Sequence, residues 1–160
     1  MANFEIKDGV AIIPEGTEKI NPGMEFKVGD YSFEIISQEE KTCRAIGFWN
    51  KEWSSNKYVE AQTVCEIPET VTYDGTVYTV TEIGQPAGCS FYGGKIKIPK
   101  TVISIGDRSF KGCNFSSITL PKGLRRIGDY AFEDMNNLKF HSMYPKRFFS
   151  YRFYPGWNFY

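Results

Sequence analysis

Two stretches of the chain nearly repeat each other. KIKIPKTVISIGDRSFKGC begins at Lys95, and SITLPKGLRRIGDYAFEDM begins at Ser117, an offset of 22 residues. When the stretches are aligned by Pro99 and Pro121, the apolar, Gly-Asp and Phe positions match without an insertion or deletion. A fixed period in this range is typical of a solenoid, in which each unit buries its apolar face by stacking on its neighbours.

Each position of the unit has a structural interpretation. Ile96 and Ile98 alternate with lysines, as in a half-buried strand, and Pro99 ends the strand because it has no N–H to donate. Gly106 permits a backbone conformation that other residues avoid. Asp107 is expected to cap a short helical turn over RSFKGC. The unit therefore predicts a strand, a bend and a short helical turn in each coil.

The chain upstream contains a looser copy and a different motif. CEIPETV, from Cys65, and the later VTEIG match the two halves of the unit, and TYDGTVYT between them predicts an inserted hairpin around its Asp-Gly pair. FKVGDYSFEIISQEEKTCRAIGFW, from Phe26, predicts a short antiparallel meander that caps the repeats. IIPEGTEKI, at Ile12 to Ile20, is a fainter echo, either a degenerate unit or chance.

Length and charge exclude several classes. The chain has 160 residues and a formal net charge of zero, so no long-range field attracts it to nucleic acid or a membrane. No apolar run approaches the roughly 20 residues of a membrane span. The first residues, MANFEIKDGVAIIPEG, lack the basic start and apolar stretch of a signal peptide. A cytosolic protein and a trimmed exported protein both fit.

Residues that carry chemistry form no recognisable constellation. The four cysteines, Cys43, Cys65, Cys89 and Cys113, form no close pair, so buried small hydrophobes are favoured over a zinc site. The single histidine, His141, lacks an orienting neighbour for a Cys-His nucleophile pair. No phosphate-binding loop or GxSxG stretch occurs, and the carboxylates are scattered. We predict no enzyme and no catalytic, cofactor-binding or metal-binding residues.

Stacked strands align equivalent outward side chains in columns. On neighbouring strands Glu66 would face Lys97 and Glu69 would face Lys100, and such pairs support register modestly. The alternative is a ligand surface on the same sheet face. The candidate protein-binding face comprises Lys95, Lys97, Ser117, Thr119, Lys100 and Lys122.

Charge is unevenly distributed along the chain. Between Lys95 and Arg126 only Asp107 opposes eight basic residues, and the N-terminal portion is correspondingly acidic. The default interpretation is a mixed, solvated surface, and the functional alternatives are attraction of an acidic partner and head-to-tail association. Nucleic acid is not expected, because the basic residues are spread over several faces of the coil.

The end of the chain is rich in aromatic residues without a strand or helix period. It folds back as a cap over the last repeat, or forms a dimer or partner interface, or stacks on sugar rings. The candidate interface or cap aromatics are Phe149, Tyr151, Phe153, Tyr154, Trp157 and Phe159.

The pattern IxIPxxVxxIGxxxFxxC, from Ile96 to Cys113, resembles the BspA-like bacterial leucine-rich repeats, as does YDGTVYTVTEIG after CEIPETV. The resemblance covers about Phe26 to Phe140. It implies a right-handed solenoid with a parallel sheet on one face, display at a cell surface, adhesion to host or matrix proteins and no catalysis.

We therefore predict an α/β solenoid: a short right-handed leucine-rich-repeat coil of period 22 with a parallel β-sheet face, preceded by an antiparallel β-meander and hairpin cap. Residues 1–64 form the N-terminal segment and meander cap, 65–140 about three repeats, and 141–160 the aromatic tail or cap. This forms a single domain.

The predicted function is non-enzymatic binding of host or cell-surface proteins, without a cofactor, nucleic acid or membrane insertion. One alternative is a homo-oligomeric assembly module joined through a solenoid end or the tail. A second alternative is a carbohydrate-binding module that uses the tail aromatics. The resemblance places the protein at the cell surface, and the missing signal peptide leaves the cytoplasm as the alternative.

Overall fold

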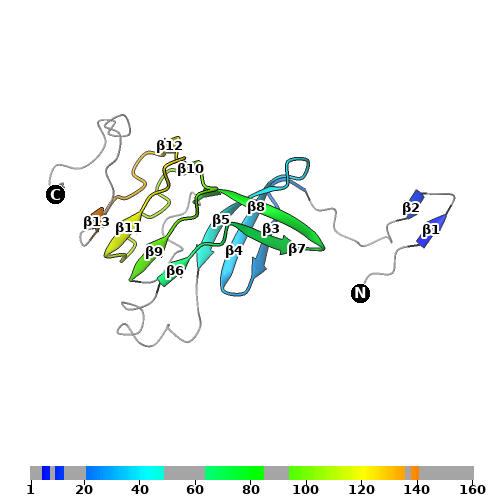
Figure 1. Cartoon of the computed structure of the whole chain (residues 1–160), viewed down its shortest axis with the longest axis horizontal. Helices are drawn as coiled ribbons and strands as arrows, with labels where there is room; N and C mark the ends of the chain where they lie inside the picture. The colour runs from blue at the N-terminus through cyan, green and yellow to red at the C-terminus, as the bar shows by residue number, and fades with distance from the viewer. Residues whose placement is uncertain are drawn as a thin grey trace.

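The structure is a computed structural model that describes residues 5–7, 10–12, 21–48, 64–84, 94–135 and 138–140. The echo at 13–20, Cys89, His141 and the aromatic tail at 141–160 lie outside the described residues. A separate antiparallel hairpin joins β1 (Glu5–Lys7) and β2 (Val10–Ile12). The remaining strands form a four-stranded sheet and a seven-stranded sheet (Figure 1).

The four-stranded sheet is built from one short strand of each successive coil. Its strands are β6 (Val64–Glu66), β9 (Lys95–Lys97), β11 (Ser117–Thr119) and β13 (Lys139–Phe140). All its pairs are parallel, and Lys95 pairs with Val64 on one side and Ser117 on the other. The predicted parallel sheet and the predicted alignment of the two repeats are confirmed.

The seven-stranded sheet joins the meander to the repeats. It comprises β3 (Glu25–Val28), β4 (Tyr31–Ser37), β5 (Thr42–Phe48), β7 (Thr70–Tyr73), β8 (Thr76–Ile83), β10 (Ser104–Ile105) and β12 (Arg126–Ile127). β3, β4 and β5 pair antiparallel, as predicted for the meander. β5 then pairs in parallel with β8, which β10 and β12 follow in parallel. Each repeat therefore contributes to two parallel ladders rather than one.

The predicted hairpin is present between β7 and β8, which pair antiparallel from Thr70 to Thr79. At its turn Asp74 has a φ of 46° and Gly75 a φ of 71°. Two successive left-handed residues are the requirement of the tight turn that Asp-Gly favours. The sequence signal for this hairpin is confirmed.

The predicted helical turn is wrong. The described residues contain no helix, so the α/β class is corrected to a strand-and-turn solenoid within this part of the chain. The N–H groups of Arg108, Phe110 and Gly112 donate to carbonyls of the next coil, at distances of 2.8–2.9 Å. Donors committed to a neighbouring coil cannot make the i to i−4 bonds of a helix. Arg108 also has a φ of 54°, outside the helical region.

One core runs through the meander, hairpin and repeats. Buried residues from Phe26 to Met135 form a single cluster. In the repeats, Phe110 stacks on Phe132 with ring centroids 5.5 Å apart and planes at 11°. In the meander, Phe26 stacks on Phe33 at 5.5 Å and on Tyr73 of the hairpin at 4.4 Å. The predicted shared interior of successive coils is therefore present.

Candidate protein-binding face

The six residues predicted as the binding face lie on or just beyond neighbouring strands of the four-stranded sheet, and we call this set the repeat face. Its members are Lys95, Lys97, Ser117, Thr119, Lys100 and Lys122. The strand alternation explains their outward direction: Lys95 and Lys97 are exposed, whereas Ile96 between them is 3% exposed. The same alternation places Ser117 and Thr119 outward around the buried Ile118. The structure therefore brings Lys95, Lys97, Ser117 and Thr119 to one side of the sheet, and Lys100 and Lys122 are exposed just beyond the ends of β9 and β11.

Two lysines of the repeat face have carboxylate partners on the preceding coil. The Nζ atom of Lys97 lies 3.3 Å from Glu66, and that of Lys100 lies 3.4 Å from Glu69. Both predicted charge pairs are therefore formed. Among the described residues no ion pair joins Lys95 or Lys122 to a carboxylate. Within the described ranges, the repeat face thus combines two lysines paired with carboxylates, two lysines without such a pair and two hydroxyl groups.

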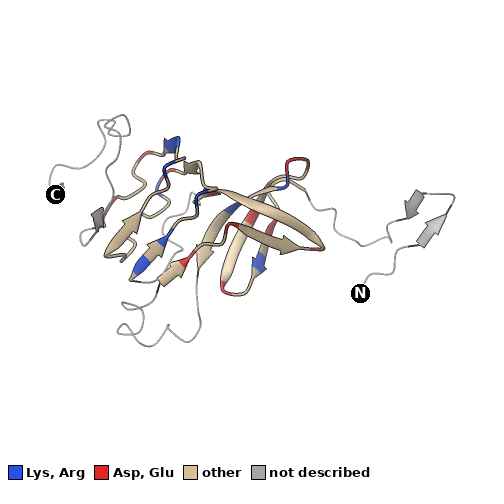
Figure 2. Cartoon of the chain, viewed as in Figure 1, with Lys and Arg blue, Asp and Glu red and all other residues tan. Residues whose placement is uncertain are grey.

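The charge on the repeats continues beyond this sheet. Lys and Arg gather on β9 and around β12, whereas Asp and Glu are more frequent over the meander and the hairpin (Figure 2). Arg126 on β12 lies 3.2 Å from Asp107, and Arg108 stacks over the ring of Tyr130 at 5.6 Å. The polarity predicted from the sequence is present on the folded surface.

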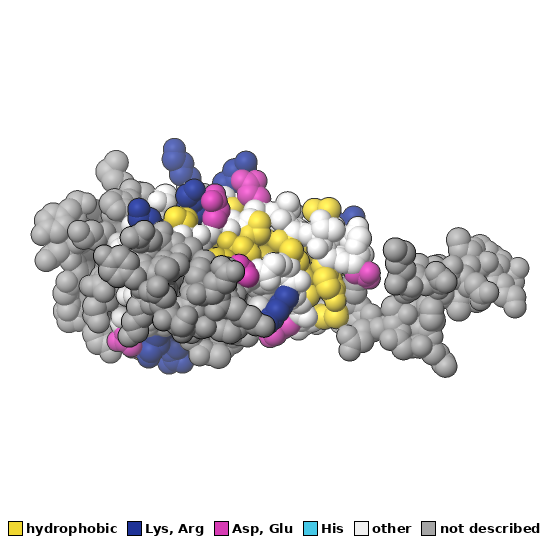
Figure 3. All heavy atoms as spheres, turned by 90° about the horizontal axis from the view of Figure 1, so that it is seen from below, with side chains coloured by type: hydrophobic (Ala, Val, Ile, Leu, Met, Phe, Trp, Pro, Cys, Tyr) yellow, Lys and Arg dark blue, Asp and Glu magenta, His cyan; other side chains and the backbone are white. Residues whose placement is uncertain are grey.

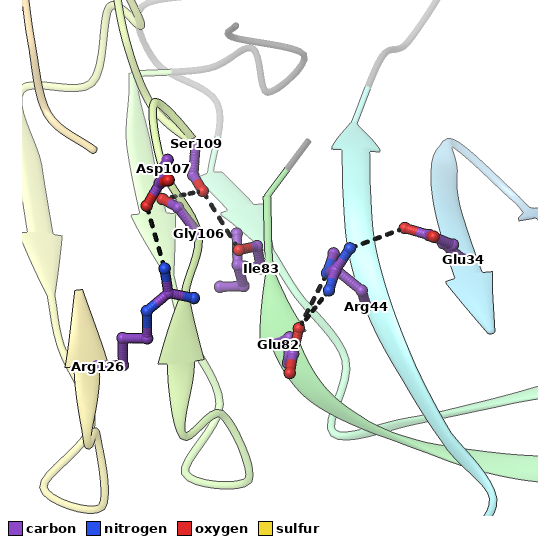
Figure 4. Close-up of polar contacts among 8 residues, drawn as sticks. All are labelled: Glu34, Arg44, Glu82, Ile83, Gly106, Asp107, Ser109 and Arg126. Atoms are coloured by element: carbon purple, nitrogen blue, oxygen red, sulfur yellow. Dashed lines mark hydrogen bonds and ion pairs between the residues drawn. The ribbon is translucent and has the colours of Figure 1, made fainter. Parts of the chain in front are cut away.

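A glycine and an aspartate join the coil of β10 to the coil of β12. The Oδ1 atom of Asp107 accepts a hydrogen bond of 3.0 Å from the backbone N–H of Asp129, and the same atom lies 3.2 Å from the Arg126 guanidinium (Figure 4). The Asp107 side chain therefore links two coils and does not cap a helix. Gly128 lies directly beneath this contact, where a Cβ atom would come within 2.3 Å of the Asp107 nitrogen. The repeated Gly-Asp pair is explained by this close approach of the two coils, which follows the pairing of β10 with β12.

The N-terminal edge of the four-stranded sheet is closed by a tyrosine. Tyr31, at the start of β4, packs against Phe48 and donates its hydroxyl to the Glu66 carbonyl at 2.5 Å. The Glu66 carbonyl points away from β9, since the next residue, Ile67, donates its N–H to Lys97 on β9. Tyr31 therefore satisfies an acceptor of an edge strand, which is one way proteins prevent strand addition.

An arginine joins the meander to the first repeat on the seven-stranded sheet. Arg44 on β5 lies 2.6 Å from Glu82 on β8 and 3.0 Å from Glu34 on β4 (Figure 4). These three side chains are each about 30% exposed. Burial lowers and the two carboxylates raise the pKa of Arg44, with a net increase. The sequence analysis identified neither Arg44 nor Tyr31. Each contacts a strand that is distant in the sequence, and no motif predicts which strands lie next to each other.

The described side chains show little that resembles catalytic chemistry. Cys43 and Cys65 are buried free thiols, and burial raises the pKa of Cys43 to about 12. Such thiols stay protonated and are poor nucleophiles. Cys113 is buried, as predicted, and it is in addition disulfide-bonded, which the sequence did not indicate. Within the described ranges, no group of three or more His, Cys, Asp or Glu residues is placed to hold a metal ion.

Apolar side chains reach the surface outside the repeat face. Val77 is 54% exposed and Ile103 is 39% exposed, on different coils. A band of apolar side chains is visible in the view from below (Figure 3). Partly buried members of the core surface are Met24, Val28, Tyr31, Tyr73, Ile98, Ile127 and Leu138. The repeat face itself is polar, so it is suited to recognition by charge and hydrogen bonds.

The described part of the chain also has no helix of the length and apolarity needed to cross a membrane.

Parallel strands stacked coil upon coil, with a Gly-Asp contact between two of the coils, define a leucine-rich-repeat solenoid. Residues 78–154 match the family model described as "BspA type Leucine rich repeat region (6 copies)". This part of the chain therefore belongs to the BspA-type leucine-rich-repeat family, which confirms the resemblance. Members of this class generally act in protein interactions and not as enzymes.

Two solved structures support the same fold. A leucine-rich cell surface protein from Faecalibacterium prausnitzii matches with a TM-score of 0.59 and 23% identity, over 76% of this chain and 31% of its own. The pneumococcal vaccine antigen PcpA matches with a TM-score of 0.53 and 18% identity, over 76% of this chain and 39% of its own. The chain thus spans between three and four tenths of the length of these two proteins. No curated protein matches the sequence significantly.

Proposed function

We propose that the chain is a non-enzymatic protein-binding module that binds its partner through the repeat face. The observation that supports this function best is the parallel register of β6, β9 and β11, which gathers Lys95, Lys97, Ser117 and Thr119 on one flat, solvent-exposed surface. The hydroxyl and ammonium groups of this surface are hydrogen-bond donors without a catalytic arrangement. Such a surface binds a partner and does not transform it.

We further propose that the module is displayed at a bacterial cell surface and contributes to adhesion to host or surface proteins. The F. prausnitzii protein, which is a leucine-rich cell surface protein, supports this location. The disulfide at Cys113 also supports it, because structural disulfides persist in oxidising compartments. A cytoplasmic location is the alternative.

The coil geometry proposed from the sequence is right-handed with a period of 22 residues. In support, Ser104 pairs with Arg126, and Lys95 pairs with Ser117. Right-handed connection between parallel strands of one sheet is the strong general rule. The tail aromatics stay a predicted second interface or cap.

The experiment is a binding panel with purified full-length chain. We expect the wild type to bind at least one extracellular-matrix or host-surface protein, and Lys95→Glu with Lys122→Glu to weaken binding at least about tenfold. The matched control is Lys27→Glu with Lys41→Glu, which changes the net charge by the same amount at two exposed positions of the meander. Equal loss in both variants, or no loss in either, would remove the repeat face as the binding surface.

A further inference from the structure

We propose that the partner of the repeat face is an acidic protein segment, and that Glu66 and Glu69 compete with it for Lys97 and Lys100. This inference rests on the proposed function of the repeat face. The two glutamates lie on the coil that precedes the lysines, so the chain carries its own carboxylates at the position where a partner's carboxylates would bind. In this arrangement the glutamates of the first coil weaken the binding of the partner to the lysines of the second coil.

The placement of the charges supports this competition. Glu66 and Lys97 are paired across β6 and β9, and Glu69 and Lys100 follow just past the ends of those strands. On the other side of β9, the positions opposite Lys95 and Lys97 are the hydroxyl residues Ser117 and Thr119. Positive charge is therefore neutralised on the β6 side and left available on the β11 side, with Lys122 beyond it.

The two ion pairs are weak enough to be replaced. The side chains of Lys97 and Glu66 are 63% and 65% exposed, and those of Lys100 and Glu69 are 82% and 49% exposed. Exposed pairs of this kind are screened by water and salt and contribute little to stability. A partner carboxylate can therefore exchange with Glu66 or Glu69 without unfolding the coil.

The chemistry favours an acidic protein segment over a nucleic acid or a sulfated polysaccharide. The cations of the repeat face are all lysines, and two carboxylates stand among them, which opposes a ligand with a negative charge on every unit. The hydroxyl groups of Ser117 and Thr119 suit a ligand that alternates charged and hydrogen-bonding groups, as a peptide does. A segment with spaced Glu or Asp side chains meets both conditions.

The test measures the affinity of a fluorescent twelve-residue peptide of alternating Glu and Ser by anisotropy at low and physiological salt. We expect Glu66→Gln with Glu69→Gln to bind the peptide about fourfold more tightly than the wild type, since each of the two released lysines accounts for a factor of about two. The control is Glu39→Gln with Glu40→Gln, which removes the same two charges from the exposed β4–β5 turn. We expect the control to change the affinity less than about twofold. Far-UV circular dichroism checks that all variants keep the native sheet content.

Three outcomes overturn the inference. Unchanged affinity in the Glu66 and Glu69 variant shows that these carboxylates do not compete, and equal tightening in the control shows a general charge effect. Equal tightening for a sulfated oligosaccharide or single-stranded DNA of the same charge shows an unspecific polyanion surface. None of these results contradicts the proposed function, which is tested separately by the loss of partner binding in the Lys95 and Lys122 variant.

Discussion

The repeats and the meander are stabilised in different ways. In the repeats, each coil presents the same residue types to its neighbour, so Phe110 lies on Phe132 and Ile96 pairs with Ile118. In the meander, no residue has a copy, and contacts join unlike partners such as Phe26 with Tyr73 and Arg44 with Glu82. Repeated coils specify their own stacking, whereas the meander depends on a few individual contacts that attach it to the first coil.

The largest expected effect is on the stacked phenylalanines of the repeats. Phe110 is fully buried and its replacement by Ala leaves a cavity beside Phe132, so Phe110→Ala should lower the free energy of unfolding by about 4 kcal/mol. Urea unfolding followed by circular dichroism measures this loss. Val77→Ala, at a side chain that is 54% exposed, should change stability by less than about 0.5 kcal/mol.

The same titration tests whether the two regions are one cooperative unit. Because one cluster of buried residues spans meander and repeats, wild type and Phe110→Ala should each unfold in a single transition. Two separated transitions in the variant would show that the meander folds without the repeats.

The next effect concerns the close approach of coils at the Gly-Asp pair. A methyl group on residue 128 would lie 2.3 Å from the Asp107 nitrogen and 2.5 Å from the Gly106 carbonyl carbon, both backbone atoms. Gly128→Ala should therefore cost about 3 kcal/mol of unfolding free energy, measured by thermal or urea unfolding. Gly123→Ala is the control, because its nearest neighbour would lie at 3.7 Å, an ordinary contact. Similar stability of the two variants would contradict the close coil approach.

The sequence predicts the repeats well because the same residue type recurs at equivalent positions of successive units. Pro99 with Pro121 and Gly106 with Gly128 establish the alignment, and the Asp74-Gly75 turn identifies the hairpin by local chemistry alone. The prediction of a helical turn is wrong because an Asp that caps a helix cannot be distinguished by sequence from an Asp followed by a turn. In this turn the backbone N–H groups after Asp107 donate hydrogen bonds to the next coil. The candidate face follows from strand alternation, and its use in binding remains a prediction.

The attachment of the meander could not be predicted. The parallel pairing of β5 with β8 contains a register shift between Cys43 and Arg44, and no local pattern specifies which strand a meander adds to. Without knowledge of the pairing of β5 with β8, the sequence gives no reason to distinguish Arg44 from other surface residues or Tyr31 from other core residues.

The arginine that makes this attachment gives the third prediction. Arg44→Met removes both ion pairs and leaves Glu34 and Glu82 without their cation, so we expect a loss of about 2 kcal/mol, reduced from a fully buried case by the partial exposure of all three. A double-mutant cycle with Glu82→Gln should give a coupling of about 1 kcal/mol. Additive effects would show that Arg44 acts through packing and not through its charge.

The smallest effect is expected at the tyrosine that closes the sheet edge. Tyr31→Phe keeps the ring against Phe48 and removes the hydrogen bond to Glu66, so stability at neutral pH should fall by about 1 kcal/mol. Tyr73→Phe, which keeps the stack on Phe26, serves as the control and should change stability less.

The pH dependence of this difference separates the hydrogen bond from packing. Burial raises the pKa of Tyr31 above that of an exposed tyrosine, which is about 10. As the pH rises past about 10, the unfolded chain releases the Tyr31 proton while the folded chain retains it, so the wild type loses stability that the Phe variant does not lose. The difference between wild type and Tyr31→Phe should therefore narrow above pH 10 in urea titrations. No difference at neutral pH would mean that Tyr31 contributes through its ring alone. A nonzero difference that stays constant above pH 10 would mean that the hydroxyl releases its proton equally in the folded and unfolded chains, which contradicts its burial and its hydrogen bond to Glu66.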